Sequence, residues 1–130
     1  MGKWLVCIDV GGTFTDGWAR SPVGDEIRCK VLSSGIIRTR VAGLDGNWID
    51  CERPLSGHAT GLEGFTLKSG GLVLDCNPLE GRLKLDRSSS IGETLELVSG
   101  EDAPLVAARI LTGTAVGKTF PQMDLRVATT

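Results

Sequence analysis

The 130-residue chain lacks tyrosine, has one histidine and carries only three tryptophans and three phenylalanines. It also lacks a run of basic residues and has a formal net charge of −2, so the usual electrostatic footprint of a nucleic-acid-binding protein is missing. Its longest apolar stretches are a few residues long, whereas a membrane-spanning helix needs about 20. We expect no nucleic-acid or membrane partner, and the lack of a charged leader with an apolar segment predicts a cytoplasmic protein.

Close cysteine pairs are missing too. The four cysteines, at positions 7, 29, 51 and 76, lie far apart without a CxxC motif, which favours reduced thiols over a zinc or redox site. Glycine is abundant instead: 18 residues are about twice the average usage of roughly 7%. With 41% hydrophobic residues, the composition indicates a globular chain with many turns and short strands.

Three strand-like stretches open the chain, at 3–10, 13–20 and 27–32. The first is apolar and rich in β-branched residues, and the third alternates apolar with charged residues. Short turns separate them, which predicts three antiparallel strands. Gly17 interrupts the second stretch, as a β-bulge would.

Residues 36–100 hold six short β-like runs separated by turns that contain glycine, the spacing of a small β-barrel or sandwich. Residues 100–113 carry the start and stop signals of a helix, with acids and Pro104 at its beginning and Gly113 after its end. Its predicted apolar face consists of Leu105, Ala108, Leu111 and Thr112. Residues 123–130 read as a further strand.

The string DVGGTFTD, residues 9–16, is a candidate phosphate loop. Asp9 ends a buried strand, where its carboxylate could hold Mg²⁺ or an attacking water. Gly11 and Gly12 let the backbone approach a polyphosphate, and their N–H groups with that of Thr13 could bind an anion.

Two further residues of the string add polar groups. Thr15 offers a second hydroxyl to phosphate or metal-bound water, and Asp16 is a second acid on the neighbouring strand. The alternative is a plain β-hairpin whose two acids lie at its solvated end. Neither GxGxxG nor GxxxxGK[ST] occurs in the chain. His58, in the glycine-flanked PLSGHATG, is predicted to be an exposed loop residue.

DVGGTFTD resembles the signature that opens the hydantoinase/5-oxoprolinase family, A-type subunit, within the actin-like ATPase superfamily. Three later stretches are also similar to that family: KVLSSG (30–35), SGEDAPLVAARILTG (99–113) and FPQMDLRVATT (120–130). The resemblance implies a β-rich α/β fold. Residues 1–35 and 101–130 would form the start of a ribonuclease-H-like domain, with three antiparallel strands, one helix and a fourth strand, and residues 36–100 an inserted small β-barrel.

The implied activity is ATP-dependent hydrolysis of a small cyclic amide, with ATP and Mg²⁺ as cofactors of the full-length parent. Asp9 would serve the metal and the catalytic water, with Asp16 as a second catalytic acid. The nucleotide-binding residues would be Gly11, Gly12, Thr13 and Thr15. We expect an N-terminal fragment that is inactive alone, with a B-type subunit or a second copy as possible partners. The alternatives are a sugar-type kinase of the same superfamily and a subunit-interaction module.

Overall fold

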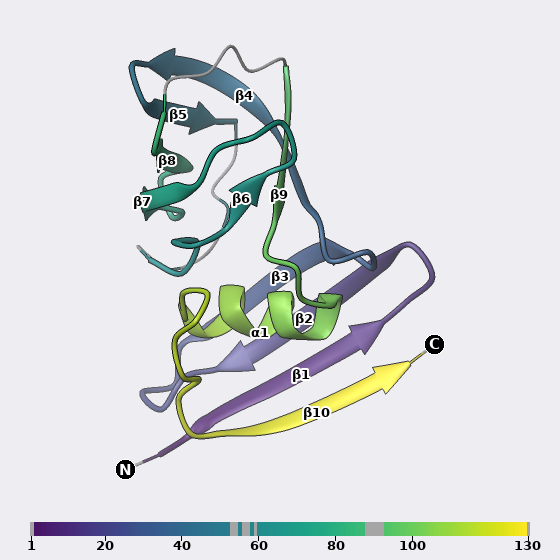
Figure 1. The fold of residues 1–130 in the computed structure, drawn as a ribbon. Coiled ribbons are helices and arrows are strands. Elements are labelled where there is room, and N and C mark those ends of the chain that lie inside the picture. Colours follow the sequence, from purple (N-terminus) through teal and green to yellow (C-terminus); the bar gives the residue numbers. More distant parts are fainter. Residues whose placement is uncertain (1, 53–54, 56–57, 59, 88–92, 130) are drawn as a thin grey trace.

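The computed structural model describes residues 2–52, 55, 58, 60–87 and 93–129. These residues form two β-sheets and one helix, a β-rich α/β arrangement in agreement with the sequence analysis. Figure 1 shows the helix lying between the two sheets, with both termini at the sheet drawn below it. The helix has ten residues, and no helix in the described ranges is long and apolar enough to cross a membrane.

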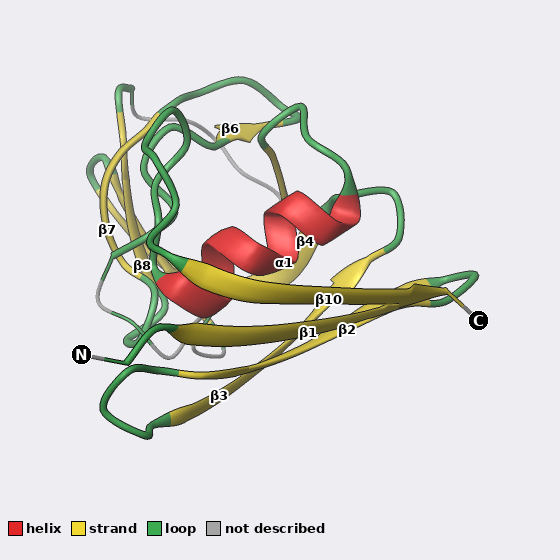
Figure 2. Cartoon of the chain, turned by 90° about the horizontal axis from the view of Figure 1, so that it is seen from below, coloured by secondary structure: helices red, strands yellow, loops and turns green. Residues whose placement is uncertain are grey.

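The first sheet contains the predicted opening strands and the last strand. Its members are β1 (Trp4–Val10), β2 (Phe14–Arg20), β3 (Glu26–Leu32) and β10 (Met123–Thr129), in the order β10-β1-β2-β3. The pairs β1–β2 and β2–β3 are antiparallel, which confirms the prediction, and β10 runs parallel to β1. Figure 2 shows β10 along one side of this sheet.

The predicted bulge at Gly17 is wrong, because β2 pairs with both neighbours without a register shift. The glycine serves close packing instead. A Cβ at this position would lie 2.8 Å from Cys29 Sγ and 2.8 Å from Leu111 Cδ1. The missing side chain therefore lets the helix lie close against the middle of the sheet.

The helix α1 (Ala103–Thr112) begins and ends where its signals predict. Proline stands in its first turn, and Gly113 caps its end in the left-handed conformation, with φ of 69°. One predicted core position is wrong: Leu105 is 39% exposed, whereas seven other helix residues are buried. The helix packs against β1, β2 and β3, so its buried surface is wider than one stripe.

The second sheet takes up most of the chain between β3 and α1. Its strands are β4 (Ile37–Asp45), β5 (Trp48–Cys51), β6 (Thr66–Leu67), β7 (Val73–Asn77), β8 (Arg82–Leu85) and β9 (Thr94–Val98). The order is β6-β9-β4-β5-β8-β7, and β4 bends at a register shift between Val41 and Gly43. Thr66 of the end strand β6 forms an isolated bridge with Leu72, the residue before the other end strand β7, so the sheet curls back on itself.

The segment that forms the second sheet begins and ends at one place on the first sheet and α1. Ile37, at the start of β4, pairs with Leu97 near the end of β9. Gly35 adopts a φ of +88°, and a Cβ there would lie 2.6 Å from the Glu101 carbonyl oxygen. The two crossings between the sheets are therefore in contact.

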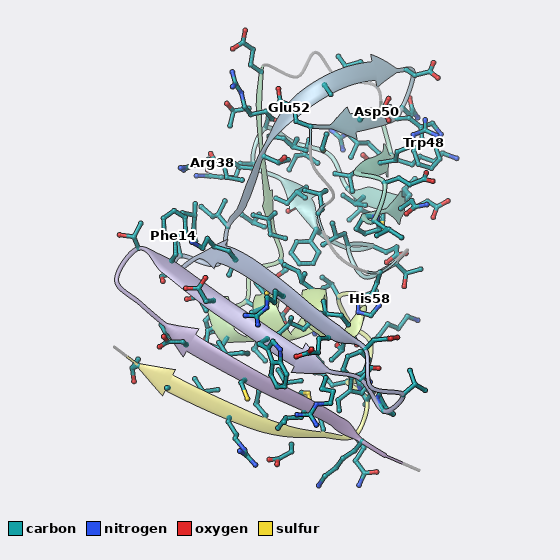
Figure 3. All side chains as sticks on the ribbon, turned by 180° about the vertical axis from the view of Figure 1, so that it is seen from behind. Phe14, Arg38, Trp48, Asp50, Glu52 and His58 are labelled. Carbon is teal, nitrogen blue, oxygen red and sulfur yellow. The ribbon has the colours of Figure 1, made fainter. Side chains whose placement is uncertain are left out.

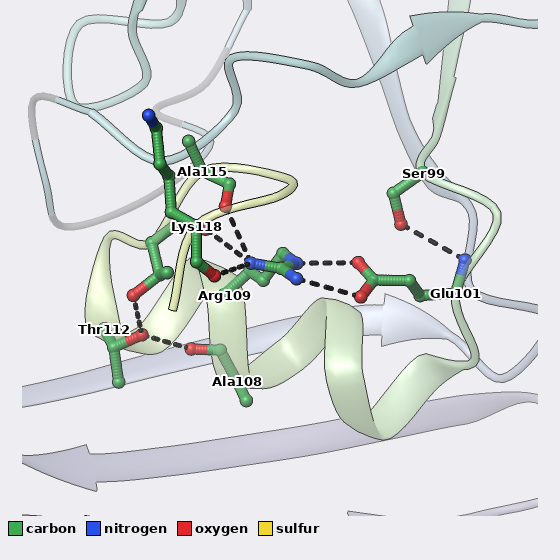
Figure 4. Close-up of polar contacts among 8 residues, drawn as sticks. Ser99, Glu101, Ala108, Arg109, Thr112, Ala115 and Lys118 are labelled. Atoms are coloured by element: carbon green, nitrogen blue, oxygen red, sulfur yellow. Dashed lines mark hydrogen bonds and ion pairs between the residues drawn. The ribbon is translucent and has the colours of Figure 1, made fainter. Parts of the chain in front are cut away.

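Arg109 on α1 is the only charged side chain that is buried among the residues described. Its Nε and Nη2 donate to the two carboxylate oxygens of Glu101 at 2.6 and 3.0 Å, and its Nη1 donates to the Ala115 carbonyl at 2.7 Å (Figure 4). Nη1 also reaches the carbonyls of Thr114 and Lys118 at 3.5 and 3.4 Å. The guanidinium thus ties the segment before the helix to the loop after it. Sequence analysis treated Glu101 only as one of the acids at the helix start and missed this pair.

Replacing Arg109 should destabilise the fold strongly. Arg109→Ala leaves Glu101 and several carbonyls without their donor, and we expect a loss of about 3–5 kcal/mol in the free energy of unfolding. Arg38→Ala is the control, because its pair with Glu96 is exposed and should contribute about 1 kcal/mol or less. Denaturant unfolding measures both. Equal losses for the two variants would contradict the role given to Arg109.

The same pair predicts a dependence of stability on pH. The hydrogen bonds from Arg109 lower the pKa of Glu101 from its ordinary value of 4.5. A lowered pKa in the folded state gives stability that is present above pH 4.5 and is lost as the pH falls through the folded value. The difference in unfolding free energy between the wild type and Glu101→Gln should therefore shrink in acid. A difference that stays constant down to about pH 2 would contradict this.

Candidate functional site

The hairpin of β1 and β2 places two carboxylates side by side. Asp9 and Asp16 are direct cross-strand neighbours, and both are exposed on the face of the sheet away from α1. Like charges in this position repel, so a cation between them would be favoured. Lys30 lies 3.9 Å from Asp16, whereas Asp9 has no ion pair with any described residue. The two acids expected from the sequence are thus brought together.

This outer face of the first sheet carries a shallow hollow of about 480 Å³. Both carboxylates line it, together with residues one row further from the turn. That row crosses all four strands, because Cys7 is paired with both Trp18 and Arg126, and Trp18 is paired with Arg28. A ligand at the carboxylates would therefore meet an indole and two cations beside it.

Ser33 fixes the turn between β1 and β2 by hydrogen bonds to its backbone. Its Oγ donates to the Gly11 carbonyl at 2.7 Å, and its N–H donates to the Thr13 carbonyl at 2.8 Å. The Thr15 hydroxyl lies 3.0 Å from the same Oγ and is fully buried on the helix side of β2. Thr15, expected to contact nucleotide, is thus bonded to the support of the turn, while Thr13 is exposed. Sequence analysis noted the segment of Ser33 and missed its role.

The two glycines of the turn differ in backbone conformation from most other glycines of the chain. Neither Gly11 nor Gly12 has a positive φ. A Cβ on Gly12 would meet no atom within 4 Å, in contrast to the 2.8 Å contacts at Gly17. The chain's own backbone and packing therefore do not require glycine at position 12. The open space above Gly12 is room for an external group.

His58 lies away from this site. Its Nε2 is 2.7 Å from the Leu111 carbonyl, and its ring centroid is 5.9 Å from that of Trp4 at the far end of β1. Figure 3 shows Phe14, next to the hairpin turn, and His58 at opposite ends of the sheet. The expected exposed loop position is wrong, because His58 is half-buried against the end of α1. His58 thus connects the segment between β5 and β6 to the end of the helix.

The buried cysteines do not add chemistry to the site. Burial, and to a lesser extent the charge of Asp16, together raise the pKa of the Cys29 thiol to about 12. Burial likewise raises the pKa of Cys51 to about 11 and of Cys76 to about 12. These three thiols are protonated at neutral pH and are free.

The described residues contain no group of three or more histidine, cysteine, aspartate or glutamate side chains that could hold a metal ion. Asp9 and Asp16 can therefore supply two ligands at most, which leaves the remaining positions of a cation to water or substrate oxygens. Comparison with family models, curated proteins and solved structures found no match.

Two glycine substitutions separate packing from ligand access. Gly17→Ala should lower the free energy of unfolding by about 1–3 kcal/mol, because the added methyl overlaps Cys29 and Leu111. Gly12→Ala should change it by about 0.5 kcal/mol or less, since the methyl enters open space. Denaturant unfolding of both variants measures the contrast. A large loss for Gly12→Ala would mean that the chain itself needs this glycine.

Proposed function

We propose that the chain supplies the first metal- and phosphate-binding half of an ATP-dependent cyclic-amide hydrolase of the hydantoinase/5-oxoprolinase type. The observation that carries the proposal is Gly12, which stands in an exposed turn between two paired carboxylates without a packing reason to be glycine. A plain hairpin turn does not need this combination. A loop that a phosphate approaches does.

The donor set fits Mg²⁺. This ion keeps several waters and binds through one or two carboxylates together with substrate phosphates. Asp9 and Asp16 offer that number of carboxylates at the surface, next to the turn. A site with a full cage of protein ligands would not fit the same ion as well.

The architecture of the first sheet supports the proposed lineage. Three antiparallel strands are followed, after the second sheet, by a helix and a fourth strand. These are the elements of the ribonuclease-H-like start that the resemblance implies, and we propose that assignment for residues 1–35 and 101–130. The curled second sheet would be the inserted small barrel of residues 36–100.

Each residue of the hairpin has a role in this proposal. ATP, when bound, supplies the phosphoryl group that activates the amide oxygen. Asp9 holds the metal and orients water, and Asp16 lies opposite as the second acid. The N–H groups of Gly12 and Thr13 bind phosphate oxygens, whereas the N–H of Gly11, also expected to bind phosphate, donates to the Phe14 carbonyl at 3.0 Å and closes the turn. Thr15 acts through Ser33 by fixing the turn.

Binding to the chain itself is the first test. An actin-like site closes between two lobes, and the described residues hold one candidate phosphate loop, so Mg-ATP should bind with a Kd of about 1 mM or weaker. Amide NMR shifts should be confined to the hairpin turn and its support. Asp9→Asn and Gly12→Ala should each weaken binding, while Asp25→Asn, in the exposed β2–β3 turn, should not. No shift at about 10 mM Mg-ATP, or sub-micromolar affinity, would refute the half-site.

The reaction is tested on the product of the complete native reading frame. Its ATP hydrolysis should increase when 5-oxoproline or a hydantoin is added. Asp9→Asn should remove this stimulation, and Asp25→Asn should retain it. Stimulation by a sugar with formation of a sugar phosphate would favour the kinase instead. A reading frame that stops at Thr130 would count against the enzyme.

A further inference from the structure

Lys30 on β3 lies directly across from Asp16 on β2. Its Nζ is 3.9 Å from the Asp16 carboxylate and 5.0 Å from the centroid of the Phe14 ring. Phe14 begins β2, next to the hairpin turn (Figure 3). Of the basic side chains that the structure describes, only Lys30 forms an ion pair with either carboxylate of the site. Its ammonium group is thus held between one of these carboxylates and an aromatic ring beside the turn.

Both contacts of the ammonium group are easily exchanged. The side chains of Lys30 and Asp16 are 61% and 60% exposed, and exposed ion pairs contribute little to stability. The Phe14 ring is exposed as well, so its cation–π contact with Lys30 forms in water and is weak. Lysine also carries its charge on a flexible stem with three N–H donors that can turn toward a new acceptor. Lys30 can therefore change partners without disturbing the sheet.

A divalent cation at the two aspartates would compete with Lys30. Asp16 faces Asp9 on one side and Lys30 on the other, in one row across β1, β2 and β3. An ammonium group and a metal ion that both approach the Asp16 carboxylate repel each other. Metal binding therefore favours a position of the Lys30 side chain away from Asp16.

A bound polyphosphate would supply the new partner of Lys30. The Phe14 ring, which the ammonium group already contacts, belongs to the residue two positions after Gly12, where the open space of the turn lies. Lysine binds phosphate as a point charge. Arg28 is placed less well, because it pairs with Trp18, one row further from the turn. Lys30 is thus the basic residue of β3 that is nearest to the turn.

We propose that Lys30 binds the phosphate groups of the nucleotide at this site, and that the metal ion arriving with them releases it from Asp16. The inference rests on the function proposed above. Without ligand, Lys30 offsets part of the charge of the two aspartates. With Mg-ATP, the metal ion takes that place and Lys30 donates to a phosphate oxygen. The site thereby favours a metal–polyphosphate complex, since polyphosphate alone is repelled by the carboxylates and metal alone competes with the ammonium group.

Lys30→Met should change the binding of metal and of nucleotide in opposite directions. Mn²⁺, which prefers octahedral oxygen ligands as Mg²⁺ does, should bind the variant about threefold more tightly at low salt, because the competing ammonium group is gone. Mg-ATP should bind it about tenfold more weakly, because a hydrogen bond from a charged donor to phosphate is lost. Line broadening by Mn²⁺ and amide shifts with Mg-ATP, both followed by NMR at the hairpin, measure the two effects.

Two further variants separate this role from effects of net charge and stability. Lys30→Arg keeps a cation at the position and should retain Mg-ATP binding to within about threefold. Lys68→Met, at an exposed position directly after β6, removes the same charge and should leave both titrations unchanged. The urea midpoint of Lys30→Met should equal that of the wild type, because the ion pair it removes is exposed.

The outcomes distinguish this inference from the function on which it rests. If the wild type binds Mg-ATP at the hairpin and Lys30→Met binds it equally well, Lys30 does not bind phosphate, while the hairpin site stands. If Lys30→Met weakens Mn²⁺ and Mg-ATP binding alike, the release of Lys30 by the metal ion is refuted. A wild type whose hairpin responds to neither ligand would overturn the proposed function together with this inference.

Discussion

A buried guanidinium sets the path of the chain around the helix. Arg109 is taken out of water, so its donors must all find acceptors within the protein. Glu101 supplies two of them and the carbonyls of the loop after α1 supply the rest. That loop is thereby bent back along the helix, and Phe120 lies 4.6 Å from the guanidinium. Strand β10 begins three residues later, beside β1, so the edge of the first sheet depends on how this charge is satisfied.

The hairpin site is organised differently on its two faces. On the helix side, Thr15 and Ser33 form a hydrogen-bonded support that fixes the backbone of the turn. On the outer face, the strict alternation of β1 and β2 brings Asp9 and Asp16 together in water. Rigidity and ligand access therefore come from opposite faces of one pair of strands. A preformed turn of this kind loses little conformational freedom when it binds.

Much of this arrangement follows from local patterns. The strand and helix boundaries follow from alternation, turn residues and capping signals, and the pairing of Asp9 with Asp16 follows from a short turn between antiparallel strands. Contacts between distant segments do not follow from such patterns. The roles of Gly17, Ser33 and Arg109 depend on partners 12 residues away or more, or on carbonyls of a loop without periodicity. His58 is half-buried because the segment between β5 and β6 packs against the end of α1, a contact that no local sequence pattern encodes.

The contact between Gly35 and Glu101 has a consequence for how such a chain could diversify. The segment that forms the second sheet begins and ends at neighbouring points. The first sheet and α1 therefore constrain only the positions of its two ends. The entropic cost of closing a loop rises only slowly with the length of the loop. An inserted segment of another length would therefore change the stability of the first sheet and α1 little. The segment inserted between Gly35 and Glu101 can therefore be exchanged in evolution for one of another size. The hairpin of β1 and β2 and its two aspartates would keep their geometry.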